Sequence, residues 1–77
     1  MRTFSTARVK EVLRRELKLV PIGRGDSSGH ERWGRDGRYV RPALRGKDIP
    51  FAYAYSLGQE LEIKGFIPRR AFIGLLK

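Results

Sequence analysis

The chain of 77 residues contains no cysteine, a single histidine and only eight Asp and Glu residues. Without cysteine there is no disulfide scaffold, no thiolate nucleophile and no thiolate metal site. One histidine and eight scattered carboxylates supply neither a His-rich metal site nor an acidic cluster to hold Mg²⁺. These absences favour a function that uses no metal, and we expect no other cofactor.

The sequence also lacks a long apolar run. Residues 1–6 are followed by charged residues rather than by the apolar segment of a secretory signal. No uncharged stretch approaches the ~20 residues that a membrane helix needs. We therefore expect a cytoplasmic protein without a membrane partner, and its length predicts a single domain over residues 1–77.

Positive charge is what the chain has in excess. Seventeen Lys and Arg residues oppose the eight acids, which gives a net charge of +9. Residues 1–23 carry six bases and two acids, residues 24–47 seven and three, and residues 48–77 four and three. A folded domain with such an uneven positive field attracts polyanions, of which nucleic acid is the commonest. The alternative is that the charge serves solubility alone.

Apolar spacing predicts three helices. The first follows a cap at Ser5 or Thr6 and buries one face, formed by Val9, Val12, Leu13 and Leu17. The second follows a cap at Asp48 and ends at Gly65, with a buried face of Phe51, Ala54, Tyr55, Gly58 and Leu61. Tyr53 points away from that face, towards a partner. Pro68 opens a short third helix whose Phe72, Leu75 and Leu76 point inward.

Between the first two helices the sequence predicts three strands. Residues 19–22 form a short edge strand, because Pro21 cannot donate a ladder hydrogen bond. Asp36-Gly37 is a two-residue turn signal that joins residues 30–35 and 38–44 in a hairpin. This register pairs Trp33 with Val40 on the core side. The other face carries His30, Arg32, Tyr39, Arg41 and Ala43, because side chains alternate along a strand.

The expected fold class is therefore α+β. The order is α-β-β-β-α followed by a short C-terminal helix, with helices on one face of a three-stranded antiparallel sheet. The opposite face of the sheet is open and basic.

This order of elements resembles the HicA family of toxin–antitoxin ribonucleases over nearly the whole chain. The family signature is a Gly-Ser-His element with an aromatic residue three places after the histidine. Residues 28–33, Ser-Gly-His-Glu-Arg-Trp, stand in its place, with Gly29 where the family has serine. The resemblance implies a fold similar to double-stranded-RNA-binding domains, metal-independent cleavage of mRNA, and a HicB-type antitoxin that covers the active site.

In such a reaction the 2′-OH of the RNA is the nucleophile. His30 is the candidate catalytic residue, because a histidine that titrates near neutrality can take or give a proton. Arg32 and Arg41 are candidates to hold the phosphate, and Tyr39 to stack on a base or donate a proton. Arg24, Arg45 and Lys47 complete the predicted RNA-binding set. A single histidine predicts a slow enzyme.

Two other functions remain open at this level. Gly29 motivates a non-catalytic RNA-binding module, in which His30 is an ordinary hydrogen-bonded surface residue. A protein-interaction adaptor with an acidic partner also accounts for the charge.

Overall fold

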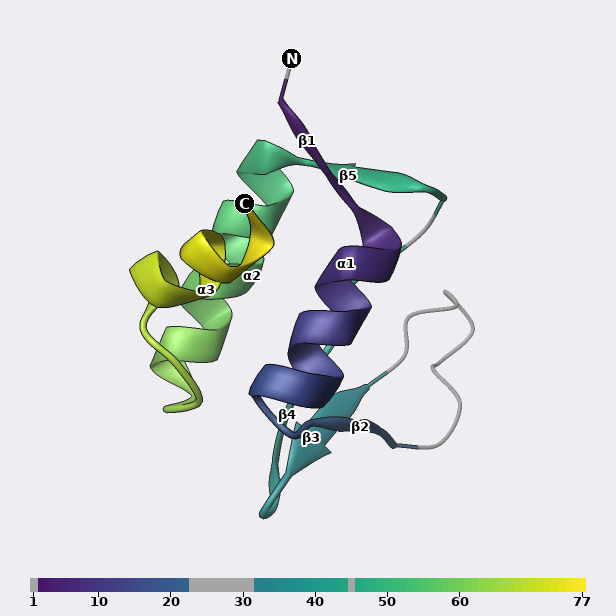
Figure 1. Cartoon of the computed structure of the whole chain (residues 1–77). Coiled ribbons are helices and arrows are strands. Elements are labelled where there is room, and N and C mark those ends of the chain that lie inside the picture. The colour runs from purple at the N-terminus through teal and green to yellow at the C-terminus, as the bar shows by residue number, and fades with distance from the viewer. Residues whose placement is uncertain (1, 23–31, 45) are drawn as a thin grey trace.

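In the computed structural model, which describes residues 2–22, 32–44 and 46–77, helices and two small sheets share one core (Figure 1). The helical elements are α1 (Thr6–Glu11), η1 (Val12–Glu16), α2 (Phe51–Ile63) and α3 (Arg69–Leu76). The strands are β1 (Thr3–Ser5), β2 (Val20–Pro21), β3 (Trp33–Arg35), β4 (Arg38–Val40) and β5 (Asp48–Pro50). Strands β2-β3-β4 form a three-stranded antiparallel sheet, and β1 pairs with β5. The α+β class is confirmed.

The first predicted helix is confirmed, with one difference in its second half. The Ser5 hydroxyl accepts a hydrogen bond of 3.3 Å from the backbone N–H of Arg8, so Ser5 is the N-cap. From Val12 the helix widens into the π-helical turn η1, and the Leu17 N–H donates to the Val12 carbonyl five residues back. The predicted apolar face is fully buried.

The predicted hairpin register is confirmed. Trp33 pairs with Val40 and Arg35 with Arg38, and Trp33 and Val40 are only 1% and 0% exposed. Asp36 and Gly37 have φ values of +55° and +78°, as a two-residue type I′ turn requires. The strands are shorter than predicted, and β4 ends before Pro42, which has no N–H for the ladder. Residues 30 and 31 lie outside the described residues.

The edge strand is confirmed as well. In β2, Val20 pairs with Gly34 and Pro21 with Trp33. The Ile22 N–H extends this pairing by donating to the Arg32 carbonyl at 2.7 Å. Among the described strands β2 pairs with β3 alone, so Pro21 lies at the edge of this sheet and removes no bond from its interior.

The β1–β5 ribbon was not predicted, and it corrects the start of the second helix. Phe4 pairs with Ile49, and both side chains are buried. Asp48 therefore lies in β5 and does not cap α2, whose N-cap is Pro50. Figure 1 shows this ribbon at one end of α1 and the β3–β4 hairpin at the other.

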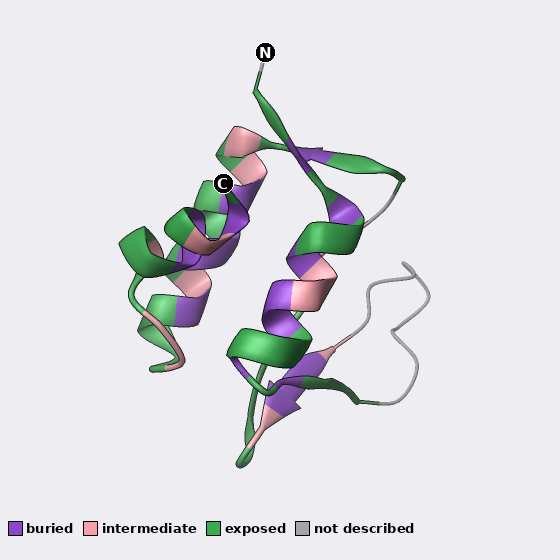
Figure 2. Cartoon of the chain, in the orientation of Figure 1, coloured by how far each residue is buried: buried purple, intermediate pink, exposed green. Residues whose placement is uncertain are grey.

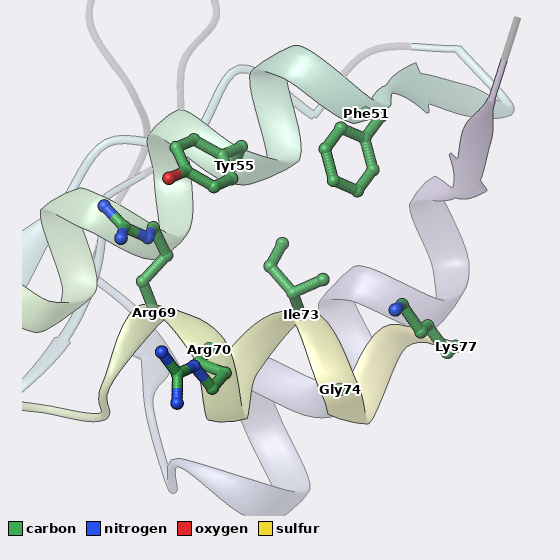
Figure 3. Close-up of a pocket in the computed structure, with 7 residues that line it drawn as sticks. All are labelled: Phe51, Tyr55, Arg69, Arg70, Ile73, Gly74 and Lys77. Atoms are coloured by element: carbon green, nitrogen blue, oxygen red, sulfur yellow. The ribbon is translucent and has the colours of Figure 1, made fainter.

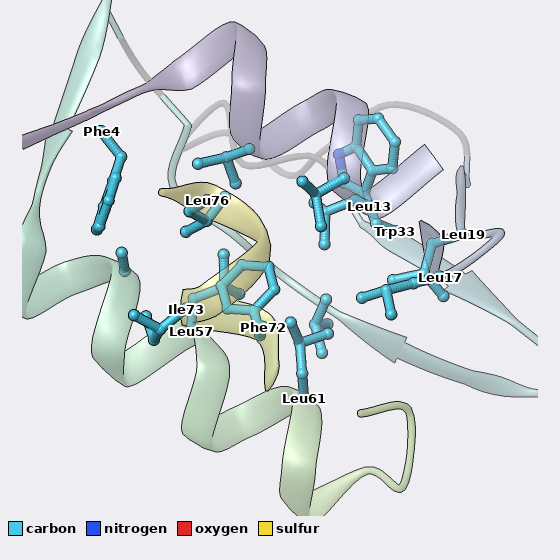
Figure 4. Packing of buried hydrophobic residues seen from close by; sticks show 14 of the residues in the cluster. Phe4, Leu13, Leu17, Leu19, Trp33, Leu57, Leu61, Phe72, Ile73 and Leu76 are labelled. Atoms are coloured by element: carbon cyan, nitrogen blue, oxygen red, sulfur yellow. The ribbon is translucent and has the colours of Figure 1, made fainter. Parts of the chain in front are cut away.

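Side chains from both sheets and all helices build the core (Figures 2 and 4). The largest fully buried side chains include Trp33, Phe72, Leu13 and Leu61. Gly58 is buried where α2 meets α3: an added Cβ would lie 3.1 Å from both Arg69 Cγ and Phe72 Cδ2. Close packing therefore explains a glycine inside a helix, where it weakens helix formation by up to ~1 kcal/mol.

Two aromatic residues of α2 differ from the prediction. Tyr55 is 41% exposed rather than buried, and Leu57 occupies the buried face in its place. Tyr53 does not point towards a partner, because its ring packs on the core and its hydroxyl accepts a hydrogen bond from the Ala43 N–H. In α3, Phe72 and Leu76 are buried as predicted, Leu75 is half-buried, and Ile73 is an additional core residue.

Candidate functional site

The β3–β4 hairpin presents a cationic and aromatic surface, which we call the hairpin surface: Arg32, Arg35, Arg38, Tyr39, Lys64 and Phe66. Tyr39, in β4, is 41% exposed. The Arg32 guanidinium carbon lies 5.7 Å from the centroid of the Tyr39 ring, and Lys64 Nζ lies 5.9 Å from it. Cations within about 6 Å of an aromatic ring are attracted by the ring's quadrupole.

A glycine fixes where the Tyr39 ring lies. Gly34 pairs with Tyr39 across the two strands and is buried. A Cβ at Gly34 would lie 2.2 Å from the Arg38 carbonyl oxygen and 2.7 Å from Tyr39 Cβ. Only a residue without a side chain allows this approach, so Gly34 positions Tyr39 on the hairpin.

Two arginines of the surface have structural partners. Arg38 donates a hydrogen bond of 2.7 Å to the Lys64 carbonyl, which is at the C-terminal end of α2. Arg35 donates through Nε to the Leu17 carbonyl at 2.8 Å, and pairs with Asp36 at 2.9 Å. Carbonyls at helix ends lack intrahelical partners, so these cations stabilise the ends of η1 and α2.

The ring of Phe66 also has two cationic side chains close to it. The guanidinium carbons of Arg35 and Arg38 lie 5.5 Å and 5.2 Å from the centroid of Phe66. Phe66 is half-buried between α2 and α3, where Gly65 ends α2 with a φ of +82°. Arg35 and Arg38 therefore anchor the hairpin to the helices, whereas Arg32 and Tyr39 offer an exposed ring beside a positive charge.

The structure brings together only some of the predicted site residues. Arg32 and Tyr39 are in contact, and Arg41 follows β4 directly and is exposed. Lys47 is not part of this surface: its carbonyl accepts from the Thr6 N–H at the opposite end of α1 from the hairpin. The candidate catalytic His30 and the candidate RNA-binding Arg24 and Arg45 lie outside the described residues.

Lys64, Phe66, Arg35 and Arg38 were absent from the predicted site. Strand alternation puts Arg35 and Arg38 on the helix side of the hairpin, where the sequence predicts core contacts only. Lys64 and Phe66 reach the hairpin because α2 ends beside β4, which is an edge strand. The sequence contains one signal that could have pointed to Lys64 and Phe66: a base, a glycine and an aromatic residue follow one another at positions 64–66.

Two further properties of the described residues bear on function. Within these ranges, no group of three Asp, Glu or His side chains is arranged to hold a metal ion. None of the described helices has the length and apolar character needed to cross a membrane. Comparisons with known proteins gave no match: no family model fits the chain, and no curated protein or solved structure is significantly similar to it.

Proposed function

We propose that this protein binds RNA through the hairpin surface and cleaves it without a metal, as the toxin of a HicA-type toxin–antitoxin pair. The observation that carries the RNA-binding part is the exposed Tyr39 ring with Arg32 and Lys64 beside it. Single-stranded nucleic acid is bound by this combination, in which bases stack on aromatic rings and cations contact phosphates.

The chemistry rests on His30, which stands two residues before Arg32 in the sequence. His30 takes the proton of the RNA 2′-OH, or gives a proton to the leaving 5′-oxygen. Arg32 and Arg41 stabilise the charge that develops on the phosphate in the transition state. Tyr39 is the candidate for the second proton transfer. A HicB-type antitoxin would cover this surface and block access of RNA.

A non-catalytic RNA-binding module is the second candidate. Gly29 motivates it, because this glycine stands where the HicA family signature has serine, and the cations and rings of the hairpin surface serve binding with or without cleavage. The two candidates share the binding surface and differ in the role of His30.

One experiment separates them. Wild type and His30→Ala are purified in parallel and incubated with a long single-stranded RNA in the presence of EDTA. We expect wild type to cut the RNA and the variant to bind it equally but cut 10²–10⁴-fold more slowly. RNA that wild type binds but leaves intact would make the binding module the function. Equal cutting by both proteins would exclude His30 as the catalytic residue.

A further inference from the structure

A groove between α2 and α3 forms a second basic surface, on the opposite half of α2 from the hairpin. It has a volume of about 460 Å³ and is lined by Phe51, Tyr55, Arg69, Arg70, Ile73, Gly74 and Lys77. Figure 3 shows Phe51 and Tyr55 of α2 and Ile73 of α3 directed into the space between the helices. Arg69 lies at one end and Lys77 at the other.

The charged side chains that line this groove are all positive. Three of its seven lining residues are cations and none is acidic. In the described part of the chain, Arg69, Arg70 and Lys77 form no salt bridge. The carboxylate of Glu62 accepts the backbone N–H of Arg69 at 2.7 Å, but Glu62 does not line the groove. Cationic side chains without carboxylate partners that line one hollow favour an anionic ligand.

The floor of the groove is aromatic. The rings of Phe51 and Tyr55 lie 6.2 Å apart, and Phe4 continues the row with its ring 5.8 Å from Phe51. The Arg69 guanidinium carbon lies 4.5 Å from the centroid of the Tyr55 ring. Arg2 adds a further cation, 6.0 Å from the ring of Phe51. Flat apolar surface therefore lies within reach of guanidinium groups.

We propose that this groove binds one nucleotide of a single-stranded RNA. The base packs against Tyr55, Phe51 and Ile73, and the phosphate contacts Arg70 and Lys77. Guanidinium groups bind phosphate bidentately, and both aromatic rings and guanidinium planes stack on bases. An acidic peptide would satisfy the charge, but it would not use the aromatic floor, so the observations favour a nucleotide.

The groove and the hairpin surface lie at the two ends of one helix. Phe51 and Tyr55 are in the first turns of α2, whereas Lys64 follows its last residue and contacts Tyr39. A helix of 13 residues is about 20 Å long. A strand that contacts both surfaces must span about this length and also pass around the helix, because residues 55 and 64 are nine positions, or about 2.5 turns, apart. This extension to RNA rests on the proposed function, whereas binding of a free nucleotide to the groove does not.

Gly74 and Ala71 offer a matched pair of variants on α3. A Cβ at Gly74 meets nothing within 4 Å, so Gly74→Leu fills part of the groove without displacing the core. Ala71 is exposed on the same helix and does not line the groove, so Ala71→Leu is the control. Thermal unfolding of both variants checks that each remains folded.

The test is titration of each protein with 5′-AMP at low salt, followed by NMR chemical shifts of the backbone amides. Adenosine, inorganic phosphate and a hexaglutamate peptide are titrated as comparisons. We expect 5′-AMP to bind more tightly than each of the three and to shift amides in residues 51–55 and 69–77. Gly74→Leu should weaken the 5′-AMP binding that the amides of residues 51–55 and 69–77 report at least tenfold, whereas Ala71→Leu and Arg32→Gln should leave the binding at these amides unchanged.

Three results would overturn the inference. They are equal binding of phosphate and 5′-AMP, tighter binding of the peptide, and unchanged 5′-AMP binding by Gly74→Leu. The RNA arm uses a single-stranded oligonucleotide and the same variants. If Gly74→Leu binds RNA more weakly than Ala71→Leu, one RNA strand contacts both the groove and the hairpin surface. Equal RNA binding by the two variants contradicts this. If Arg32→Gln binds RNA as tightly as wild type, the proposed function of the hairpin surface is contradicted, whereas the result for 5′-AMP binding to the groove is unaffected.

Discussion

Arg38, on the second strand of the hairpin, donates a hydrogen bond of 2.7 Å to the carbonyl of Lys64, just beyond the last residue of α2. This bond joins two residues that are 26 positions apart in the sequence, with β5 and α2 between them. It also places the Lys64 side chain where its ammonium contacts Tyr39. Arg38 therefore has a structural role, and that role positions Lys64 beside the exposed ring of Tyr39.

The first prediction concerns this structural arginine. Arg38→Gln removes the bond to the Lys64 carbonyl and the contact with Phe66. Because Arg38 is exposed, we expect a loss of only about 1 kcal/mol in the free energy of unfolding. Arg15→Gln, on the exposed side of η1, removes the same charge and should change stability by less than about 0.5 kcal/mol. Urea unfolding measures the free energy of unfolding of both variants. Equal losses of stability in the two would mean that the change in net charge, and not the bond to Lys64, causes the effect.

The second prediction compares two glycines inside helices. At Gly74 an added Cβ meets nothing, so Gly74→Ala should stabilise the protein by about 0.5–1 kcal/mol through helix propensity. At Gly58 the same Cβ would press on Phe72, which is 0% exposed and fixed in the core. Overpacking should therefore make Gly58→Ala destabilising by about 1 kcal/mol or more. Thermal unfolding of both variants measures the two effects. Equal stabilisation by both changes would contradict the prediction, because it would mean that α3 shifts to accommodate the Cβ at residue 58 without loss of stability.

Local signals made the hairpin predictable. Asp36-Gly37 specifies a two-residue turn, and a fixed turn together with alternating side chains leaves one register in which Trp33 and Val40 face the core. The helix cap at Ser5 and the end of α2 at Gly65 could also be predicted from the sequence, because each depends on a few neighbouring residues only.

Long-range contacts were not predictable in this way. Thr3 pairs with Pro50, and three residues in each strand give too short a pattern to distinguish a ribbon from a loop. The Asp48 cap was wrong for that reason, because the ribbon holds Asp48 in an extended chain. In the candidate site, Arg32 and Tyr39 followed from the register, whereas Lys64 and Phe66 depend on where α2 ends in space.

The third prediction tests the close approach of the strands at Gly34. Gly34→Ala places a Cβ 2.2 Å from a backbone oxygen of β4, so the strands must separate. We expect a loss of about 2–3 kcal/mol in the free energy of unfolding and weaker RNA binding, because Tyr39 moves with β4. Gly37→Asn is the control, since asparagine accepts the positive φ of the turn. A stable Gly34→Ala protein with normal RNA binding would contradict this role.

The fourth prediction separates the two possible uses of Tyr39. If its ring stacks on a base, Tyr39→Ala should weaken RNA binding by about 1–3 kcal/mol, and Tyr39→Phe should bind like wild type. If its hydroxyl also gives a proton, Tyr39→Phe should cleave more slowly at unchanged affinity. Fluorescence anisotropy with a labelled RNA gives the affinity, and single-turnover cleavage gives the rate. Unchanged binding by Tyr39→Ala would remove the ring from the RNA-binding surface.

The fifth prediction uses salt to count phosphate contacts. Each phosphate of a single strand that the protein neutralises makes the slope of log K against log salt concentration more negative by about 0.7. Arg32→Gln removes a cation from beside the exposed ring, so its slope should be less negative than that of wild type by about 0.7. Arg15→Gln, on η1, should keep the wild-type slope. Because the slope reports released counterions rather than overall affinity, a variant that merely loosens the fold would lower affinity at every salt concentration and leave the slope unchanged. A wild-type slope for Arg32→Gln would therefore show that Arg32 does not contact phosphate, whatever its effect on affinity.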